Sequence, residues 1–348
     1  MRAVLWNGTR DVRTETVPDP TIERPDDAVI RVTSSGLCGS DLHLYEVLGP
    51  FMTAGDILGH EPMGVVEEVG ADVTSLVPGQ RVVVPFQICC GHCPMCGSGL
   101  QTQCDNTRVQ EQGMGASLYG YSSLYGSVPG AQAEYLLVRR AQDNAVPVPD
   151  EGPDDRYLYL SDVLPTAWQA VRYADVPQGG SVAVLGLGPI GEMACRVARH
   201  LGAEHVFGVD PVPERRARAT ARGVEVFDSS QGTDELVQRA TSFLPKGAAS
   251  KLMENVGMDR LGASLSGVYG GMVDPLPMLT LFDKQIRLRM GQANVRHRVP
   301  EILPLLDEDD VLEVEDFATH HVSLEGASEA YRRFQAKEDG TFKVVFRA

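Results

Sequence analysis

The sequence predicts an α/β protein with two domains, a β-rich domain and a doubly wound parallel-sheet domain. Short β-branched runs separated by glycine, such as AVIRVTSSG (28–36), MGVVEEVG (63–70) and RVVVPF (81–86), indicate a barrel-like β domain. From Tyr157 onward apolar strands alternate with helices, as in SVAVLGLGPIG (181–191), and this alternation is typical of a parallel sheet.

The first domain is predicted to span residues 1–156 and the parallel-sheet domain residues 157–290. The remaining residues, 291–348, contain a predicted helix near VPEILPLL, a short acidic loop and an Ala-rich helix around 326–337. A last strand, FKVVFRA, closes the chain, and we expect it to return this segment to the first domain.

Length and composition exclude several classes of protein. A chain of 348 residues with 43% hydrophobic and 22% charged residues can bury two sizeable cores. No apolar run is long enough to cross a bilayer, and the N-terminal segment lacks the features of a signal peptide. We therefore predict a cytoplasmic protein whose clustered cysteines bind metal rather than form disulfides. The net charge of −16 argues against nucleic acid or an anionic membrane surface as a main partner.

Five of the seven cysteines lie in ICCGHCPMCGSGLQTQC, at about residues 88–105. The spacing C-x2-C-x2-C-x7-C is formed by Cys90, Cys93, Cys96 and Cys104. Such short loops let a turn wrap one tetrahedral zinc ion, whereas surface thiols in a turn would leave the spacing unexplained. Cys89 points away from Cys90 along the chain, so we interpret it as a buried small side chain. Because four thiolates leave no open position on zinc, this site is predicted to be structural.

Two other segments contain the residue types of a second metal site. Cys38 lies in GLCGSDLH (36–43), and His60 and Glu61 lie in GHEPMG (59–64). A thiolate, an imidazole and a carboxylate are suitable ligands for a three-ligand zinc with an open fourth position. Spacing alone leaves open the alternative that these side chains only fill the core.

The segment GLGPIG (186–191) follows the apolar strand SVAVL and opens a helix, and Asp210 ends the next strand. Strand, helix and acidic residue lie where a dinucleotide-binding fold requires them. The predicted phosphate-binding turn consists of Gly186, Gly188, Pro189, Ile190 and Gly191. Asp210 would accept hydrogen bonds from ribose hydroxyls and repel a 2′-phosphate, so NAD is favoured over NADP. Arg215 and Arg216 weaken that preference slightly, although a solvated helix face also explains them.

Taken in order, GLCGSDLH, GHEPMGVVEEVGADV, the four-cysteine loop and GLGPIG closely resemble the zinc-dependent medium-chain alcohol dehydrogenase superfamily. The resemblance implies a GroES-like catalytic domain, a Rossmann cofactor domain and two Zn²⁺ per chain, one catalytic and one structural. It implies that Cys38 and His60 bind the catalytic zinc, with Glu61 behind them or as an exchangeable ligand. It also implies that Ser40 and His43 form a proton relay, and that the chain forms a homodimer or homotetramer.

Many members of the superfamily use a cysteine as the third protein ligand, but this chain has none between Cys104 and Cys195. The segment YLSDVLPTAW puts Asp162 in that place, and SDxxPT resembles the glutathione-independent formaldehyde dehydrogenase branch, where aspartate does this job. The alternative is that Ser161 or Asp162 only caps the helix that starts near Val163. A carboxylate in place of a thiolate should leave the zinc a somewhat stronger Lewis acid.

The activity implied by the resemblance is hydride transfer between an alcohol, or an aldehyde hydrate, and NAD. Zinc would ease removal of the alcohol proton, which would leave through the Ser40 and His43 relay while hydride passes to NAD. The same resemblance puts three further residues near the cofactor: Arg215 at the adenosine ribose, Thr166 at the nicotinamide and Lys343 at the pyrophosphate. The loops at 45–51 and 114–130 are expected to shape the substrate pocket.

The pattern departs from the superfamily at residues 258–263. Two predicted strands, KLMENVG (251–257) and SLSGVYG (264–270), are separated by six residues, too few for the crossover between parallel neighbours. Either the second strand pairs differently or a helix is missing, and that face of the sheet then needs another cover, such as a partner subunit. The competing hypothesis is therefore a non-catalytic zinc and nucleotide-binding homologue. A third, an NADPH-linked aldehyde reductase, is disfavoured by Asp210.

Overall fold

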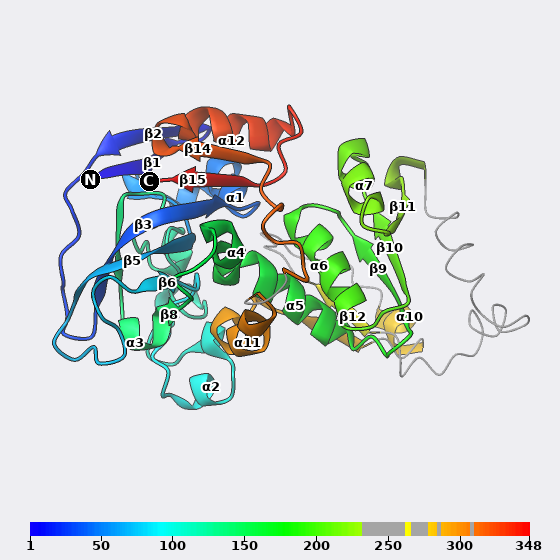
Figure 1. Cartoon of the computed structure of the whole chain (residues 1–348), viewed down its shortest axis with the longest axis horizontal. Coiled ribbons are helices and arrows are strands. Elements are labelled where there is room, and N and C mark those ends of the chain that lie inside the picture. The colour runs from blue at the N-terminus through cyan, green and yellow to red at the C-terminus, as the bar shows by residue number, and fades with distance from the viewer. Residues whose placement is uncertain (232–261, 266–277, 284–286, 307–309) are drawn as a thin grey trace, which may run out of the picture. The chain divides into compact units, whose positions relative to one another are not determined.

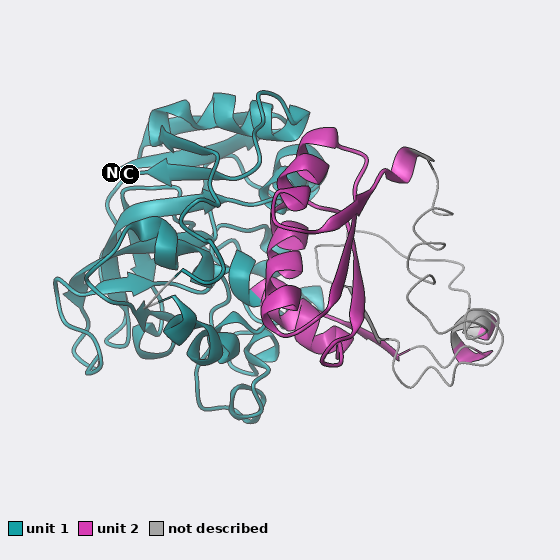
Figure 2. Ribbon diagram, turned by 45° about the vertical axis from the view of Figure 1, so that its right-hand side comes forward, with its two compact units in different colours: residues 1–165, 294–348 teal, residues 166–293 magenta. Residues whose placement is uncertain are grey.

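The computed structural model describes residues 1–231, 262–265, 278–283, 287–306 and 310–348 (Figure 1). The chain divides into two compact units (Figure 2). Unit 1 comprises residues 1–165 and 294–348, and unit 2 comprises residues 166–293. The first boundary lies at 165 rather than at the predicted 156, so Asp162 belongs to the same unit as Cys38 and His60.

Unit 1 is rich in β structure, in agreement with the prediction. Its larger sheet contains β3 (Ala28–Leu37), β5 (Glu61–Val69), β6 (Arg81–Val83), β7 (Tyr135–Val138), β8 (Val146–Pro147), β14 (His320–Ser323) and β15 (Val344–Arg347). In the described part of the chain the strand order is β14-β15-β3-β5-β6-β8, with β7 also paired to β3. A smaller sheet contains β1 (Arg2–Gly8), β2 (Asp11–Thr16) and β4 (Asp56–Ile57), in the order β2-β1-β4.

Strand β3 is the centre of unit 1, because it pairs with β5, β7 and β15. Its run of Ala, Val and Ile is almost entirely buried, which suits a strand enclosed on both faces. Ile30 and Val32 pack in one apolar cluster with Val66, Val82 and Leu136. Because Gly36 of β3 lies opposite Glu61 of β5, the two strand ends bring Cys38 and His60 close together.

The C-terminal segment belongs to unit 1. It contains α11 (Val295–Ile302), β14, α12 (Ala327–Ala336) and β15. Strand β15 pairs antiparallel with β3, with Val344 opposite Leu37 and Arg347 opposite Ser34. Helix α12 packs against β2 (Figure 1). The last residues of the chain therefore lie beside the strand that leads to Cys38.

Unit 2 contains the predicted alternation of strands and helices. A parallel sheet has the order β11-β10-β9, from β9 (Ser181–Leu185), β10 (His205–Val209) and β11 (Glu225–Phe227). Helix α5 (Val163–Ala174) enters the unit, α6 (Pro189–His200) connects β9 to β10, and α7 (Pro213–Thr220) connects β10 to β11. The buried side of α6 includes Met193, Cys195 and Val197, which accounts for its apolar spacing.

A second parallel pair in unit 2 consists of β12 (Gly262–Leu265) and β13 (Arg287–Met290), and α10 (Met278–Asp283) lies between them in the chain. The predicted strand at 251–257 and most of the short connection at 258–263 lie outside the described residues. Of the second predicted strand, 264–270, the described part belongs to β12. Within the described part of the chain, no helix has the length and apolar character needed to span a bilayer.

Glycines allow the segment before His60 to pack directly against two other segments of backbone. A Cβ atom on Gly130 would lie 2.3 Å from the carbonyl oxygen of Leu58 and 2.6 Å from Cα of Gly120. Gly120 itself has a φ of +56° and faces the backbone of Gly59 at a similar separation. The backbone that carries His60 is therefore fixed by contacts that only glycine permits.

Gly130→Ala is expected to lower the free energy of unfolding by about 1–3 kcal/mol, because its methyl group would collide with backbone atoms that cannot rotate away. Urea denaturation followed by tryptophan fluorescence measures this change. Gly39→Ala is the control, since a Cβ there has nothing within 4 Å. Equal stabilities for the two variants would contradict the expected close approach.

Candidate metal centres and cofactor loop

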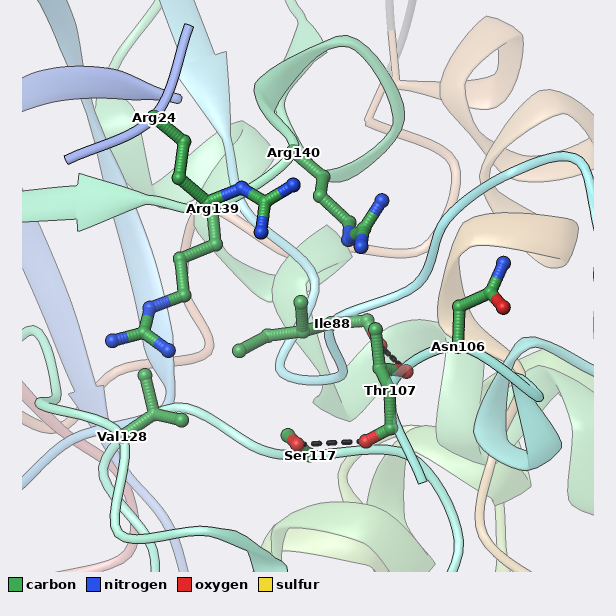
Figure 3. Close-up of a pocket in the computed structure, with 8 residues that line it drawn as sticks. All are labelled: Arg24, Ile88, Asn106, Thr107, Ser117, Val128, Arg139 and Arg140. Atoms are coloured by element: carbon green, nitrogen blue, oxygen red, sulfur yellow. Dashed lines mark hydrogen bonds between the residues drawn. The ribbon is translucent and has the colours of Figure 1, made fainter. Parts of the chain in front are cut away.

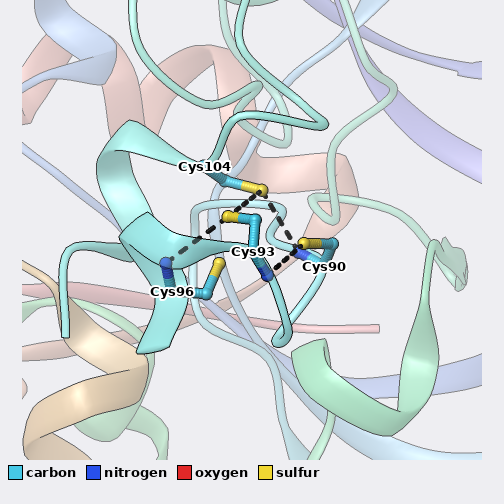
Figure 4. Close-up of side chains that lie close together, drawn as sticks. All are labelled: Cys90, Cys93, Cys96 and Cys104. Carbon is cyan, nitrogen blue, oxygen red and sulfur yellow. Dashed lines mark hydrogen bonds between the residues drawn. The ribbon is translucent and has the colours of Figure 1, made fainter. Parts of the chain in front are cut away.

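The four cysteines with metal-ligand spacing converge around the short helix α2 (Pro94–Gly97) (Figure 4). The ligand atoms of Cys90, Cys93, Cys96 and Cys104 all lie within 4.8 Å of one another, and the side chains are buried. Cys93 is the N-cap of α2, so the helix start and the metal ligands are formed by the same turn. The donor set fits one tetrahedral zinc with no open position.

Backbone and side-chain N–H groups point at these sulfur atoms. The amides of Cys90, Cys93 and Cys96 donate to the preceding or neighbouring thiols at 3.4–3.5 Å. Asn106 Nδ2 donates to Cys90 Sγ at 3.1 Å. Burial opposes ionisation of Cys93, but hydrogen bonds from the amides of Cys96 and Asp105 and from the thiols of Cys96 and Cys90 outweigh it and lower the pKa of Cys93 to about 6. At Cys93 the loop thus favours the thiolate, whereas burial and the neighbouring thiols raise the pKa of Cys96.

Cys89 is buried beside this cluster but is not part of it, as predicted. Its amide donates to Asn144 Oδ1 and its carbonyl accepts from Asn144 Nδ2, both at 2.9 Å. Asn144, in α3 (Ala141–Asn144), therefore fixes the backbone from which the cysteine loop departs.

A second cluster of possible ligands forms at the open end of β3. Cys38, His60, Glu61 and Asp162 contribute atoms that lie within 4.8 Å of one another. Asp162 Oδ2 is 3.5 Å from Cys38 Sγ and 3.5 Å from His60 Nε2. A thiol, an imidazole and carboxylates at these distances suit a zinc ion with a position left for substrate.

Asp162 reaches the cluster from the turn between a short 3-10 helix (Tyr159–Ser161) and α5. Ser161, the other candidate for a capping role, donates its hydroxyl to Leu158 O at 2.6 Å. The two neighbouring side chains are therefore used differently: Ser161 closes the preceding turn, and the carboxylate of Asp162 lies with Cys38 and His60.

Two side chains flank the ring of His60. Its Nδ1 lies 3.0 Å from Asp41 Oδ1, and its Nε2 lies 3.1 Å from Ser40 Oγ. Asp41 was not predicted as a site residue, although an aspartate three residues after Cys38 was a usable signal. Its other oxygen accepts the amide of Cys38 at 2.9 Å, so one carboxylate connects two of the clustered residues. His43, predicted to continue the relay from Ser40, is partly buried in α1 (Asp41–Glu46).

The cluster buries more acidic than basic groups. Cys38, Asp41, Glu61 and Asp162 are each no more than 9% exposed. Burial and then the charges of Asp162 and Glu61 raise the pKa of the Cys38 thiol to about 11. Burial alone would lower the pKa of His60, but Asp41 and Asp162 outweigh it and hold that pKa well above its usual value. Without metal, Cys38 and His60 therefore hold their protons more tightly than usual, and a bound dication would take the place of those protons.

Lys343 lies against this cluster, which the sequence did not predict. Its ammonium donates to Leu37 O at 3.0 Å and forms a fully buried ion pair with Glu61. Burial lowers the pKa of Lys343, but the charges of Glu61 and Cys38 outweigh this effect and raise it. A Cβ on Gly36 would lie 1.8 Å from Glu61 Oε2, so glycine is required for Glu61 to lie across β3. The predicted contact of Lys343 with the cofactor pyrophosphate stays a prediction.

The glycine-rich loop of unit 2 has the geometry that its sequence predicts. Gly186 has a φ of +90°, and Gly188 is the N-cap of α6, with Pro189 and Ile190 in its first turn. A Cβ on Gly191 would lie 1.7 Å from Gly186 O, so only glycine lets the helix approach the strand. The N-terminus of a twelve-residue helix thus faces the loop, as a pyrophosphate requires.

Asp210 at the end of β10 is tied to this loop. Its carboxylate accepts the amides of Leu187 and Val212, both at 2.8 Å. Arg215 Nη1 lies 3.5 Å from Asp210 Oδ2 and 3.6 Å from the position of a Cβ on Gly188. The structure therefore brings Asp210, Arg215 and the glycine loop together, and their predicted ribose contacts stay predictions. Thr166, predicted to approach the nicotinamide, lies in α5.

Aromatic side chains enclose His60. The rings of Phe86 and Tyr121 meet the imidazole edge-on, with centroids 6.2 and 6.3 Å away. Tyr121 belongs to the tract at 114–130 that was expected to shape the pocket, and Tyr125 packs on it at 5.7 Å. The surroundings of the metal cluster are thus apolar on this side.

A separate cavity of about 180 Å³ in unit 1 contains none of the predicted site residues (Figure 3). Arg24, Arg139 and Arg140 line it, and Arg24 donates to Asp26 at 2.9 Å. Asn106, another lining residue, is the donor to Cys90 Sγ. This cavity borders the cysteine loop and does not mark the catalytic centre.

Comparison with known proteins agrees with this geometry. Residues 24–150 match the family model described as the alcohol dehydrogenase GroES-like domain. Over the full length of both proteins, the chain is 35% identical to an uncharacterized zinc-type alcohol dehydrogenase-like protein, AdhB, of Bacillus subtilis. It is 34% identical to the glutathione-independent formaldehyde dehydrogenase of Pseudomonas aeruginosa over 76% of this chain and 68% of that protein. The alcohol dehydrogenase TADH from Thermus sp. ATN1 matches the fold with a TM-score of 0.86 at 34% identity, covering 100% of this chain and 99% of that one.

Lys343→Met is expected to destabilise unit 1 by about 3–5 kcal/mol, because it leaves the buried carboxylate of Glu61 without its counter-charge. Urea denaturation of the zinc-loaded protein measures the change. The double variant Lys343→Met/Glu61→Gln removes both charges and should recover much of the loss. A Lys343→Met protein as stable as wild type would contradict the burial of this pair.

Zinc affinity of the Cys38–His60–Asp162 cluster is expected to rise with pH between about 7 and 9. Because the pKa of Cys38 is raised to about 11, its thiol keeps its proton over this range, and zinc must displace that proton, so higher pH favours the bound state. With one proton released from Cys38, the affinity should rise by about tenfold per pH unit, and the raised pKa of His60 acts in the same direction. Competition with a chelator over this pH range measures it, and a flat profile would show that the free ligands are already deprotonated.

Proposed function

The chain belongs to the zinc-type alcohol dehydrogenases of the medium-chain dehydrogenase superfamily, and on that premise we propose that it transfers hydride between a small alcohol or aldehyde and NAD. The observation that carries the proposal is the convergence of Cys38, His60 and Asp162 in one buried cluster. A four-thiolate site cannot bind substrate, so the chemistry falls to this second cluster.

Cys38, His60 and Asp162 would hold the catalytic zinc, and Cys90, Cys93, Cys96 and Cys104 the structural one. The catalytic zinc supplies Lewis-acid chemistry, which stabilises the negative charge that develops on the substrate oxygen. Glu61 stands behind the ligands, and its ion pair with Lys343 limits the negative charge that faces the reacting atoms. Phe86 and Tyr121 exclude water from one side of His60, which strengthens the electrostatic interactions there.

Ser40 is the first acceptor of the substrate proton in this proposal, and His43 carries it onward. The 3.1 Å separation between Ser40 Oγ and His60 Nε2 supports the first part, because it keeps the hydroxyl next to the metal ligands. A histidine suits the second part, since its ordinary pKa lies near neutrality.

The cofactor would bind at the loop Gly186–Gly191, with its phosphates at the N-terminus of α6. Asp210 favours NAD over NADP, since a carboxylate at this position repels a 2′-phosphate. Arg215 would approach the adenosine ribose, Thr166 the nicotinamide and Lys343 the pyrophosphate.

We further propose that the chain is related in mechanism to the glutathione-independent formaldehyde dehydrogenases. Asp162 supports this, because it brings a carboxylate to the cluster at the place where many relatives have a cysteine. The substrate would then be a short alcohol or the hydrate of a short aldehyde.

Purified, zinc-loaded protein is expected to reduce NAD when supplied with short alcohols or formaldehyde, seen as the absorbance of reduced nicotinamide. Cys38→Ser and Asp162→Ala should each lose one of two zinc ions and reduce kcat/KM by about a thousandfold, since metal polarisation contributes several kcal/mol. Elemental analysis gives the zinc content of each variant.

Ser161→Ala is the matched control, because its hydroxyl serves only the preceding turn. It should keep both ions and nearly full activity. Wild-type protein with two zinc ions, intact cofactor binding and no turnover of any alcohol or aldehyde would favour the non-catalytic alternative.

A further inference from the structure

A chain of buried polar side chains runs from helix α12 to the imidazole of His60. Tyr331 in α12 donates its hydroxyl to Gln132 Oε1 at 2.8 Å, and Gln132 Nε2 lies 3.5 Å from Asp41 Oδ2. Asp41 Oδ1 then faces His60 Nδ1 at 3.0 Å. Tyr331, Gln132 and Asp41 have no exposed surface at all, so water does not compete for these contacts.

The direction of the hydrogen bonds in this series of side chains suits an imidazole that binds metal. Because Tyr331 donates to the amide oxygen, the amide nitrogen of Gln132 is turned toward the carboxylate of Asp41. Asp41 Oδ2 accepts from Gln132 and from the amide of Cys38, and Oδ1 lies at ion-pair distance from Nδ1 of His60, where neither atom has a hydrogen-bond partner among the described residues. With the Asp41 carboxylate beside Nδ1, the other ring nitrogen, Nε2, is the one that faces Asp162 and an ion bound there.

The backbone holds both outer members of the chain in place. The amide of Gln132 donates to Leu58 O and its carbonyl accepts from Val4, both at 2.8 Å. The ring of Tyr331 packs against Tyr45 at 5.5 Å, and Tyr45 belongs to α1, the helix that begins with Asp41. Neither side chain can therefore move without disturbing its neighbours.

We propose that Gln132 and Tyr331 are positioning residues for the catalytic metal, which hold Asp41 and through it His60 in the orientation that binds the ion. Helix α12 thereby sets the affinity of the catalytic site without contacting it. The inference rests on the proposed function in one respect, namely that an ion binds to Cys38, His60 and Asp162.

Tyr331→Phe tests the proposal, because it removes one hydroxyl and keeps the ring. Zinc release from the full-length, zinc-loaded protein into excess chelator is followed over time, and the phase that is absent in Cys38→Ser identifies the catalytic ion. Removal of outer partners of a metal-bound histidine typically costs 10–100-fold in affinity, so the catalytic phase should be about tenfold faster in Tyr331→Phe. The phase from the four-cysteine site should not change.

Tyr45→Phe is the matched control, since it removes the other hydroxyl of the same aromatic pair but leaves the polar chain intact. It should release both ions at wild-type rates. Gln132→Leu should accelerate the catalytic phase at least as much as Tyr331→Phe, and the double variant should be no faster than Gln132→Leu alone. Co²⁺ at the catalytic site provides a second readout, because its visible bands should shift in Tyr331→Phe and not in Tyr45→Phe.

Unchanged release in Tyr331→Phe would overturn the inference while leaving the proposed function intact. Equal acceleration of both ions, matched by Tyr45→Phe, would also overturn it, because general loosening of unit 1 would then explain the effect. Wild-type protein that holds only the four-cysteine ion would overturn the proposed function, and this inference with it.

Discussion

The catalytic cluster depends on the balance of charge in a buried space. Around His60 the fold places Cys38, Asp41, Glu61 and Asp162, all nearly inaccessible to water, and among the described residues Lys343 is the buried cation that faces them. Uncompensated charges of this kind cost several kcal/mol each, so the site must hold protons or a dication. Without metal, the site meets this requirement by holding protons, as the raised pKa values of Cys38 and His60 show. A zinc ion satisfies it with both ligands deprotonated, which makes metal binding and the stability of unit 1 one linked property.

The two metal clusters differ in how the chain assembles them. The four-cysteine site comes from a single loop, and its own amides supply N–H donors to the sulfur atoms. The second cluster takes Cys38 from the end of β3, His60 from the start of β5 and Asp162 from the turn before α5. A loop can form the first site locally, whereas only the paired strands of unit 1 can form the second. The four-cysteine site therefore stabilises one loop, whereas the second cluster can form only when the whole of unit 1 is folded.

Local patterns were sufficient to predict the strands now seen as β3, β5, β6, β9 and β10, together with the cysteine loop and the glycine-rich turn, because spacing and alternation along the chain determine them. The resemblance to the superfamily implied that Cys38, His60 and Asp162 act together, and the structure brings them together. The partners of these residues could not be predicted in the same way. Tyr331 and Gln132 are 199 residues apart, and Lys343 and Glu61 are 282 apart. In the sequence Tyr331 and Gln132 look like ordinary polar residues, and Lys343 and Glu61 were predicted in other roles; only the pairing of distant elements makes them partners.

The C-terminal segment contributes two side chains that support the catalytic cluster. Strand β15 pairs with β3 immediately before Cys38, and the residue before β15 is Lys343, whose ammonium neutralises Glu61. Helix α12, just upstream, contributes Tyr331. The charge balance at Glu61 and the orientation of His60 thus both depend on residues that join unit 1 after the chain has passed through unit 2. Because β15 pairs with the strand that leads to Cys38, the geometry of the catalytic cluster depends on this last strand being in place.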